Sequence, residues 1–370
     1  MAVPFLDLKK QFAGLKAEIL AAIEAVLDSQ VLVLGPQQKQ LEQSLAEYCQ
    51  AKAGVACASG TDALLASLMA LGVKAGDEVI CPAFTFFATA GTVARVGATP
   101  VFVDIDPVTF NIDPAAIAAA ITPRTKGIIP VHLYGQMAEM ETIMRLAGPR
   151  GLFVLEDTAQ AVGATRNGKK ACSWGVAGAL SFYPTKNLNA LGDAGMIISN
   201  DEAFTATVRT VCLHGDTGGY NHVRLGGNFR MDEIHAAALN VKLKHLTNWN
   251  ESRRHHAAIY DRMLKGVEGV LTPTIAAGNE SVYNLYVVRA QRRAELTAFL
   301  KSRQIGSAVH YPKGLHEQPC FAHLGYRHGQ LPQTEKACQE VLALPVCPEL
   351  TDAQIEEAAS AVREFYEAKK

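Results

Sequence analysis

The octapeptide Ser-Phe-Tyr-Pro-Thr-Lys-Asn-Leu occupies residues 181–188, directly after a predicted strand. Pro184 breaks regular structure just before Lys186, and Phe182 and Tyr183 give the turn a rigid, partly apolar character. Desolvation disfavours the ammonium form of a lysine and leaves a neutral amine that can attack a carbonyl. A lysine in a loop is more often simply solvated, but these neighbours favour a lysine that forms a Schiff base.

A second segment, Ser-Gly-Thr-Asp at residues 59–62, leaves a predicted strand and enters a predicted helix. The first N–H groups of a helix have no internal partners and carry the positive end of the dipole, so they suit a phosphate. Gly60 allows close approach of the backbone, Thr61 adds a hydroxyl, and Ser181 would add another. Taken alone, the segment is more often an ordinary helix cap.

A third segment, Glu-Asp-Thr-Ala-Gln at residues 156–160, ends another predicted strand. Asp157 would place a partly buried carboxylate in the same crevice, where it needs a partner; a helix cap explains it equally well when it is taken alone. A protonated pyridine nitrogen would be such a partner, and Gln160 could reach a phenolic oxygen on the same ring. Together with Lys186 and the phosphate cradle, Asp157 predicts a site for pyridoxal 5′-phosphate (PLP).

Composition limits the other possibilities. The chain has 370 residues, of which 49% are hydrophobic and 19% charged, with a net charge of −1. These values argue against a disordered chain and against a general nucleic-acid binder. The N-terminus has no signal-peptide pattern and no segment is long and apolar enough for a membrane span, so a soluble cytoplasmic protein is expected. The eight cysteines form no C-x-x-C pair, and no metal site is expected.

The hydrophobic pattern predicts an α/β fold. Seven short apolar runs separated by helical segments are typical of a mostly parallel central sheet sandwiched by helices; they cover residues 54–58, 78–81, 100–103, 127–131, 153–156, 179–182 and 196–199. From about residue 231 the pattern changes to a long helix, then to strands at 281–289 and 306–310 and a capped helix from Thr351. We therefore expect a large PLP-binding domain at 1–240 and a smaller C-terminal α+β domain at 241–370.

One tempting motif is rejected. Residues 163–170 nearly spell a phosphate-binding loop, but Lys170 stands where a hydroxyl residue should hold Mg²⁺. The Asn-Gly pair at 167–168 instead predicts a hairpin turn. No G-x-G-x-x-G is present, which argues against a Rossmann-type dinucleotide-binding protein.

Almost the whole chain resembles the DegT/StrS family of nucleotide-sugar aminotransferases, which are PLP enzymes of fold type I. The resemblance rests on segments at 5–9, 33–36, 60–64, 82–86, 156–160, 181–188, 228–232 and 310–312. It implies that Lys186 binds the PLP aldehyde, Asp157 pairs with the ring nitrogen and Gln160 contacts the phenolic oxygen. Phe86 would stack on the ring. The phosphate would be held by Gly60, Thr61, Ser181 and, from the neighbouring subunit, Asn228, so that a homodimer shares its active sites.

The same resemblance implies the reaction and its partners. L-Glutamate would give its amino group to the cofactor, and a nucleotide-linked keto sugar would receive it. The sequence after Lys186, through Gly192 and Asp193, resembles members that act on 3-keto sugars. It points to a UDP-linked 3-keto N-acetylglucosamine or its uronic acid, with Arg230, His310 and Tyr311 as substrate contacts. Lipopolysaccharide or antibiotic amino sugars would be the products.

Two alternatives remain open at this stage. One is an aminotransferase for 4-keto-6-deoxy nucleotide sugars, although such members more often carry Glu-Gly-Gly after the lysine. The other is a non-catalytic regulatory relative of the same fold, against which the complete set of cofactor residues argues. A sugar dehydratase of this fold typically has histidine in place of the lysine, so Lys186 argues against it.

Overall fold

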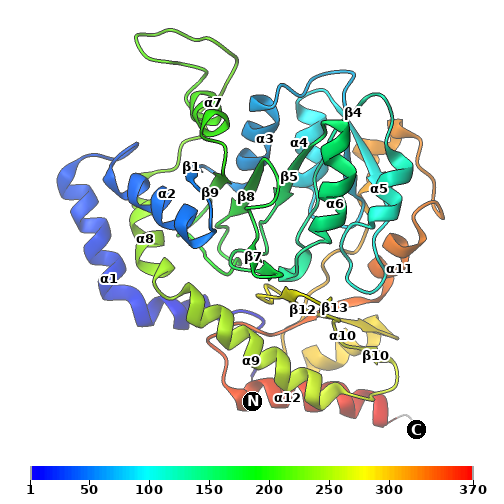
Figure 1. The fold of residues 1–370 in the computed structure, drawn as a ribbon. Coiled ribbons are helices and arrows are strands. Elements are labelled where there is room, and N and C mark those ends of the chain that lie inside the picture. The colour runs from blue at the N-terminus through cyan, green and yellow to red at the C-terminus, as the bar shows by residue number, and fades with distance from the viewer. Residues whose placement is uncertain (1, 369–370) are drawn as a thin grey trace.

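A seven-stranded sheet forms the centre of the larger region of the molecule (Figure 1), as seen in a computed structural model that describes residues 2–368. Its strand order is β1-β9-β8-β5-β4-β2-β3. The strands are β1 (Ala53–Cys57), β2 (Glu78–Pro82), β3 (Thr99–Val103), β4 (Thr125–Ile128), β5 (Phe153–Asp157), β8 (Ala177–Ser181) and β9 (Gly195–Ser199). All seven correspond to predicted strands, so the predicted sheet is confirmed.

The sheet is mostly parallel. The pairs β2–β3, β2–β4, β4–β5 and β5–β8 run parallel, whereas β9 is antiparallel to both of its neighbours, β1 and β8. The carboxyl ends of the parallel strands therefore meet at one edge of the sheet, and the start of β9 lies beside them, since Gly195 pairs with Ser181 and Cys57. Ligands of open α/β sheets bind beyond this edge.

Helices cover both faces because side chains along each buried strand alternate between them. Ile197 packs on one face with α3 (Gly60–Ala70), α4 (Ala88–Arg95) and α7 (Glu202–Cys212). Met196 and Ile198 point to the opposite face, which is covered by α2 (Pro36–Tyr48) and α8 (Glu233–Leu243) and, farther along the sheet, by α5 (Pro114–Ala120) and α6 (Met140–Ala147). This is the predicted helix–sheet–helix sandwich.

The smaller region lies below the sheet in Figure 1 and has its own core. A three-stranded antiparallel sheet, in the order β10-β12-β13, packs with three helices. These elements are β10 (Val270–Leu271), β12 (Tyr286–Ala290), β13 (Val341–Leu344), α9 (Leu246–Leu264), α10 (Arg293–Ser302) and α12 (Asp352–Glu367). The predicted capping box at the start of α12 is formed by Thr351 and Gln354.

Two segments connect the regions. Helix α1 (Leu8–Ser29) packs on α8, and Val3 joins the core of the smaller region. Residues 315–331, with the 3₁₀ turns η3 (Leu315–Glu317) and η4 (Pro319–Leu324), return to the core beside α4, where Phe321 stacks on Phe87; α11 (Pro332–Glu340) follows. Residues from before position 241 thus pack in the smaller region, and residues from after it pack in the larger one. The domain boundary at 241 stays a prediction.

The remaining elements include one correct and one wrong prediction. The Asn-Gly turn at 167–168 joins β6 (Thr165–Arg166) to β7 (Lys169–Lys170), which form a small sheet with β11 (Asn279–Glu280). The strand predicted at 306–310 is wrong, because only Ala308 bridges to a neighbour, Ala343. Two further 3₁₀ turns are η1 (Leu133–Gly135) and η2 (Gly148–Arg150). Between residues 2 and 368, no helix has both the length and the apolar character of a membrane span.

Candidate active site

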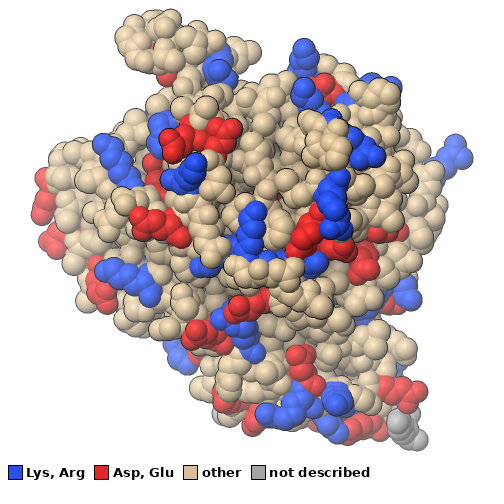
Figure 2. Space-filling view, in the orientation of Figure 1, with Lys and Arg blue, Asp and Glu red and all other residues tan. Residues whose placement is uncertain are grey.

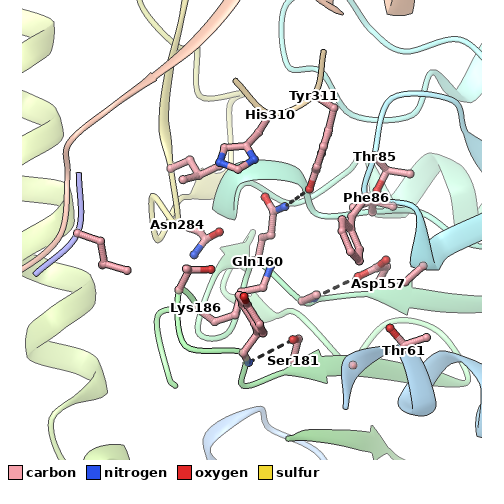
Figure 3. Close-up of a pocket in the computed structure, with 18 of the residues that line it drawn as sticks. Thr61, Thr85, Phe86, Asp157, Gln160, Ser181, Lys186, Asn284, His310 and Tyr311 are labelled. Carbon is pink, nitrogen blue, oxygen red and sulfur yellow. Dashed lines mark hydrogen bonds between the residues drawn. The ribbon is translucent and has the colours of Figure 1, made fainter. Parts of the chain in front are cut away.

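A cavity of about 490 Å³ opens at the carboxyl edge of the large sheet. Its wall combines residues that follow β1, β2, β5 and β8 with residues of the smaller region. Nine of the eleven residues predicted from the sequence line it, namely Gly60, Thr61, Phe86, Asp157, Gln160, Ser181, Lys186, His310 and Tyr311. Figure 3 shows how these side chains converge from separate elements.

The lysine stands in a turn that is closed by its own backbone. The Lys186 N–H donates to the Tyr183 carbonyl at 2.8 Å, and the Asn189 side chain donates to the Lys186 carbonyl at 3.3 Å. Burial lowers the pKa of the Lys186 amine to about 8, although the nearby Asp157 carboxylate acts in the opposite direction. A larger share of this amine is therefore neutral near pH 7 than for an ordinary lysine, as a nucleophile for aldehydes requires.

The buried carboxylate of Asp157 ends β5 and faces the cavity. Its Oδ2 accepts a hydrogen bond from the Thr89 hydroxyl at 2.8 Å, and its Oδ1 accepts from the Ala159 N–H at 3.2 Å. Burial raises the pKa of Asp157, whereas these two hydrogen bonds and the charge of Lys186 lower it. A desolvated carboxylate of this kind is suited to pair with a protonated ring nitrogen.

The predicted phosphate cradle lies at the N-terminus of α3. Ser59 caps the helix through the Asp62 N–H, which leaves the first N–H groups of the helix free of side-chain acceptors. A Cβ on Gly60 would lie 2.6 Å from the Ser181 Cβ, so only glycine lets these two segments approach so closely. Thr61 and Ser181, which both carry hydroxyls, line the cavity next to this contact. These donors fit a phosphate group.

Aromatic and amide groups form the upper wall in Figure 3. The Gln160 Nε2 donates to the Tyr311 hydroxyl at 3.0 Å, and its Oε1 accepts from the Tyr134 N–H at 2.7 Å. The Phe86 ring lies 6.3 Å from the Tyr311 ring, lines the cavity and is 57% exposed. Burial and the charge of Lys186 lower the pKa of His310, so this imidazole is neutral at physiological pH.

Taken together, the residues fit PLP. The amine of Lys186, the carboxylate of Asp157 and the cradle at Gly60 and Ser181 match the aldehyde, ring nitrogen and phosphate of the cofactor. Phe86 offers an exposed ring face for stacking. All of these groups line one cavity, which is a stronger observation than the sequence motifs alone.

Two predicted residues do not line the cavity. Asn228 and Arg230 lie at the base of an arm, residues 216–226, that projects from the body beside α7 (Figure 1). The backbone of this segment is fixed, because the Phe229 carbonyl accepts from the Ala58 N–H at 2.9 Å and the Phe229 N–H donates to the Cys212 carbonyl. The predicted roles of Asn228, as a phosphate ligand from a neighbouring subunit, and of Arg230, as a sugar contact, therefore stay predictions.

The sequence motifs missed several residues of the site. Thr89, on α4, supports Asp157, and Asn284 and Arg253 come from the smaller region. No local pattern marks these residues, because they are brought to the cavity by packing between elements that are distant in the sequence. The Thr89 hydroxyl also lies 3.1 Å from the Thr85 hydroxyl, a contact that appears only in the folded structure.

Known proteins resemble this chain along nearly its full length. A "pleiotropic regulatory protein" of Geobacillus stearothermophilus is 52% identical over 99% of both chains. A UDP-2-acetamido-2-deoxy-3-oxo-D-glucuronate aminotransferase of Pseudomonas aeruginosa is 45% identical, covering 95% of this chain and 97% of its own length. A UDP-N-acetyl-3-dehydro-α-D-glucosamine 3-aminotransferase of Acidithiobacillus ferrooxidans is 44% identical over 98% and 97%.

The fold has equally close matches among solved structures. DesV of S. venezuelae, solved in complex with a ketimine intermediate, superposes with a TM-score of 0.97, 40% identity and 99% coverage of both chains. The model of the DegT/DnrJ/EryC1/StrS aminotransferase family matches residues 14–363. This protein therefore belongs to the DegT/DnrJ/EryC1/StrS aminotransferase family.

Proposed function

We propose that this enzyme, a PLP-dependent nucleotide-sugar aminotransferase, takes its amino group from L-glutamate and delivers it to C3 of a UDP-linked 3-keto sugar. The acceptor would be 3-keto N-acetylglucosamine or its uronic acid. The names of two relatives, at 45% and 44% identity, support this acceptor class. The observation that carries the proposal is the presence of the Lys186 amine and the Asp157 carboxylate in the wall of one cavity.

The side chains divide the work. PLP, when bound, supplies an electron sink for the substrate carbon. Asp157 would hold the ring nitrogen protonated, since its carboxylate is buried in the cavity wall and a protonated nitrogen would offset the cost of its desolvation. Lys186 would move a proton between the substrate carbon and the cofactor, because an amine with a pKa of about 8 alternates readily between its two forms near neutral pH.

The remaining predicted residues are assigned to binding. Gly60, Thr61 and Ser181 would hold the phosphate, Phe86 would stack on the ring and Gln160 would contact its phenolic oxygen. His310 and Tyr311 face the same space and would contact the sugar. A neutral His310 can accept or donate a hydrogen bond to a hydroxyl without adding a charge.

We further propose a homodimer in which Asn228 and Arg230 complete the partner's site. The arm at 216–226 supports it, because Tyr220 and Leu225 are 88% and 89% exposed and the arm carries few charged side chains (Figure 2). A second apolar surface supports it too, along α1 and residues 31–34, whose exposed side chains are Leu20, Leu27, Val31, Leu32, Val33 and Leu34. Apolar surfaces of this extent mark interaction sites. We place the enzyme in the cytoplasm, making amino sugars for surface polysaccharides such as lipopolysaccharide.

Neither alternative reading is favoured. Several relatives are named for 3-amino sugars, which speaks against a 4-keto-6-deoxy acceptor. One similar protein is named as regulatory, but here the lysine, the buried carboxylate and the cradle are all present in one cavity. A chain that had lost its chemistry would have no need to keep a lysine with a lowered pKa at this position.

The acceptor is tested by product analysis. The enzyme, converted to its pyridoxamine form with L-glutamate, is incubated separately with UDP-3-keto-N-acetylglucosamine, the corresponding uronic acid and dTDP-4-keto-6-deoxyglucose. We expect a product whose NMR spectrum places nitrogen on C3, from one of the two UDP sugars. Turnover of the 4-keto sugar alone would overturn the proposed acceptor.

A further inference from the structure

A buried arginine in the cavity wall has no role in the cofactor site. Arg253 lies on α9, is only 4% exposed and lines the cavity together with Asn284. Its Nη1 donates to the Tyr283 and Asn284 carbonyls, both at 3.2 Å, whereas its buried Nε has no hydrogen-bond partner. The guanidinium is therefore anchored on one side and unsatisfied on another.

The charge of this arginine is also uncompensated. Among residues 2–368, no carboxylate lies within ion-pair distance of Arg253, and burial lowers its pKa although Glu349 acts in the opposite direction from farther away. A buried cation without a paired anion is costly, and an arginine remains charged at any physiological pH. The most economical explanation is that the missing anion arrives with a ligand.

Hydrogen bonds tie Arg253 to the lysine turn. The side chain of Asn284, whose carbonyl accepts from Arg253, donates to the Asn187 Oδ1 at 2.9 Å. Asn187 follows Lys186 directly and donates in turn to Asn250, one helical turn before Arg253 on α9, at 2.7 Å. Figure 3 shows Asn284 on the same side of the cavity as Lys186, opposite Phe86 and Asp157. Arg253 is thus linked to the lysine turn through Asn284 and Asn187, and Arg253 and Lys186 line the same cavity.

We propose that Arg253 binds a carboxylate of the amino donor; this inference rests on the proposed function, in which the donor is an amino acid. Two substrates use this cavity in turn. The donor is short and carries a carboxylate on the carbon that bears its amino group, whereas the diphosphate of a nucleotide sugar, and the C6 carboxylate of a uronic acid, are separated from the reacting C3 by atoms of the sugar ring. A guanidinium beside the lysine turn therefore suits the donor, since it forms strong charge-assisted hydrogen bonds with carboxylates.

The test compares variants of the PLP-loaded enzyme. Arg253→Met removes the charge, and Arg253→Lys keeps the charge but loses the planar fork. Arg254→Met is the matched control: Arg254 is the next residue of the same helix, is paired with Glu280 at 3.2 Å and does not line the cavity. Calorimetric titration with α-methyl-L-glutamate, which binds as a donor but has no Cα proton to lose, measures donor affinity without turnover.

We expect Arg253→Met to weaken α-methyl-L-glutamate binding by about 10- to 100-fold, Arg253→Lys to weaken it less, and Arg254→Met to leave it unchanged. The reaction of the pyridoxamine form with the keto sugar should stay within about threefold of wild type in all three variants. A loss of donor affinity without a matching loss in the keto-sugar half-reaction distinguishes a donor-binding role from a general structural role.

Other outcomes overturn the inference. Unchanged donor affinity in both Arg253 variants would do so, as would an equal loss in both half-reactions or a loss confined to the sugar. If thermal unfolding shows that Arg253→Met does not fold, a crystal structure of the wild-type enzyme with α-methyl-L-glutamate decides. A carboxylate bound to Arg253 would support the inference, and carboxylates bound only elsewhere would overturn it. A wild-type enzyme that binds no donor would instead contradict the proposed function.

Discussion

The chemical role of Lys186 could be predicted from the sequence, whereas the residues that support the site around it could not. Its aromatic neighbours and the proline predicted a desolvated amine, and burial does lower its pKa to about 8. Thr89 and Arg253, by contrast, carry no local signal. Their contacts with Asp157 and with the 283–284 backbone arise only when α4 and α9 pack against the cavity.

The pKa of Lys186 predicts how the protein takes up its cofactor. Only the neutral amine attacks the aldehyde, and the neutral fraction grows as pH rises toward the pKa and then levels off. The rate at which cofactor-free protein turns yellow with added PLP should rise roughly tenfold per pH unit below about pH 8 and flatten above it. A rate still climbing at pH 10 would show an ordinary lysine, and Lys186→Ala is the colourless control.

Thr89 predicts a smaller effect on the chemistry. Thr89→Val keeps the shape of the side chain but removes the hydroxyl that donates to Asp157 at 2.8 Å, so the pKa of that carboxyl should rise further. Pairing with the ring nitrogen weakens, and the L-glutamate half-reaction, followed by stopped-flow absorbance, should slow about tenfold. Thr89→Ser should retain most of the rate. Equal rates for valine and threonine would contradict the assigned support.

At the scale of the element, the strands were easier to predict than the connections. Each strand of the large sheet is a short apolar run, and that pattern is local. The segment at 306–310, Gly-Ser-Ala-Val-His, has only two apolar side chains and makes a single bridge, at Ala308. The helix expected from residue 231 is interrupted, since α8 ends at Leu243 and α9 begins at Leu246.

Helix α2 depends on a residue from another helix. Its N-cap, Gly35, has no side chain, and Glu233 of α8 accepts instead from the N–H groups of Gly35, Gln37 and Gln38, each at 2.9 Å. Glu233→Ala would leave these donors unsatisfied, so the free energy of unfolding should fall by about 3 kcal/mol in urea denaturation. The exposed Glu24→Ala on α1 is the control. A loss of unfolding free energy no larger than that of the control would mean that water replaces the Glu233 carboxylate as the acceptor.

At the scale of the whole molecule, chain length and the hydrophobic pattern predicted an α/β fold with a large and a smaller region, but not how the regions meet. Residues 315–331 return from the smaller region to the core of the large one, where Phe321 stacks on Phe87. Such long-range packing leaves no periodic trace in the sequence. The projecting arm was likewise invisible, because glycine-rich polar segments look like any surface loop.

The arm leads to a prediction about subunits. Lys186→Ala and Asn228→Ala should each inactivate a homodimer with shared sites, but mixing the two variants under subunit exchange should restore activity. Random pairing makes half of the dimers hybrid, each with one intact site, so about a quarter of wild-type activity is expected. Recovery of none, with exchange verified by mass spectrometry, would place Asn228 in its own subunit's site, and full activity of Asn228→Ala alone would place this residue outside any site.

The central claim is that Lys186 and Asp157 form a working PLP site, and the visible spectrum of the purified enzyme tests it most directly. We expect a yellow protein whose absorbance is lost on addition of L-glutamate and restored by the keto sugar, with no such change in Lys186→Ala. A wild-type protein that stays colourless when PLP is added, or a Lys186→Ala variant that responds to L-glutamate like wild type, would contradict it.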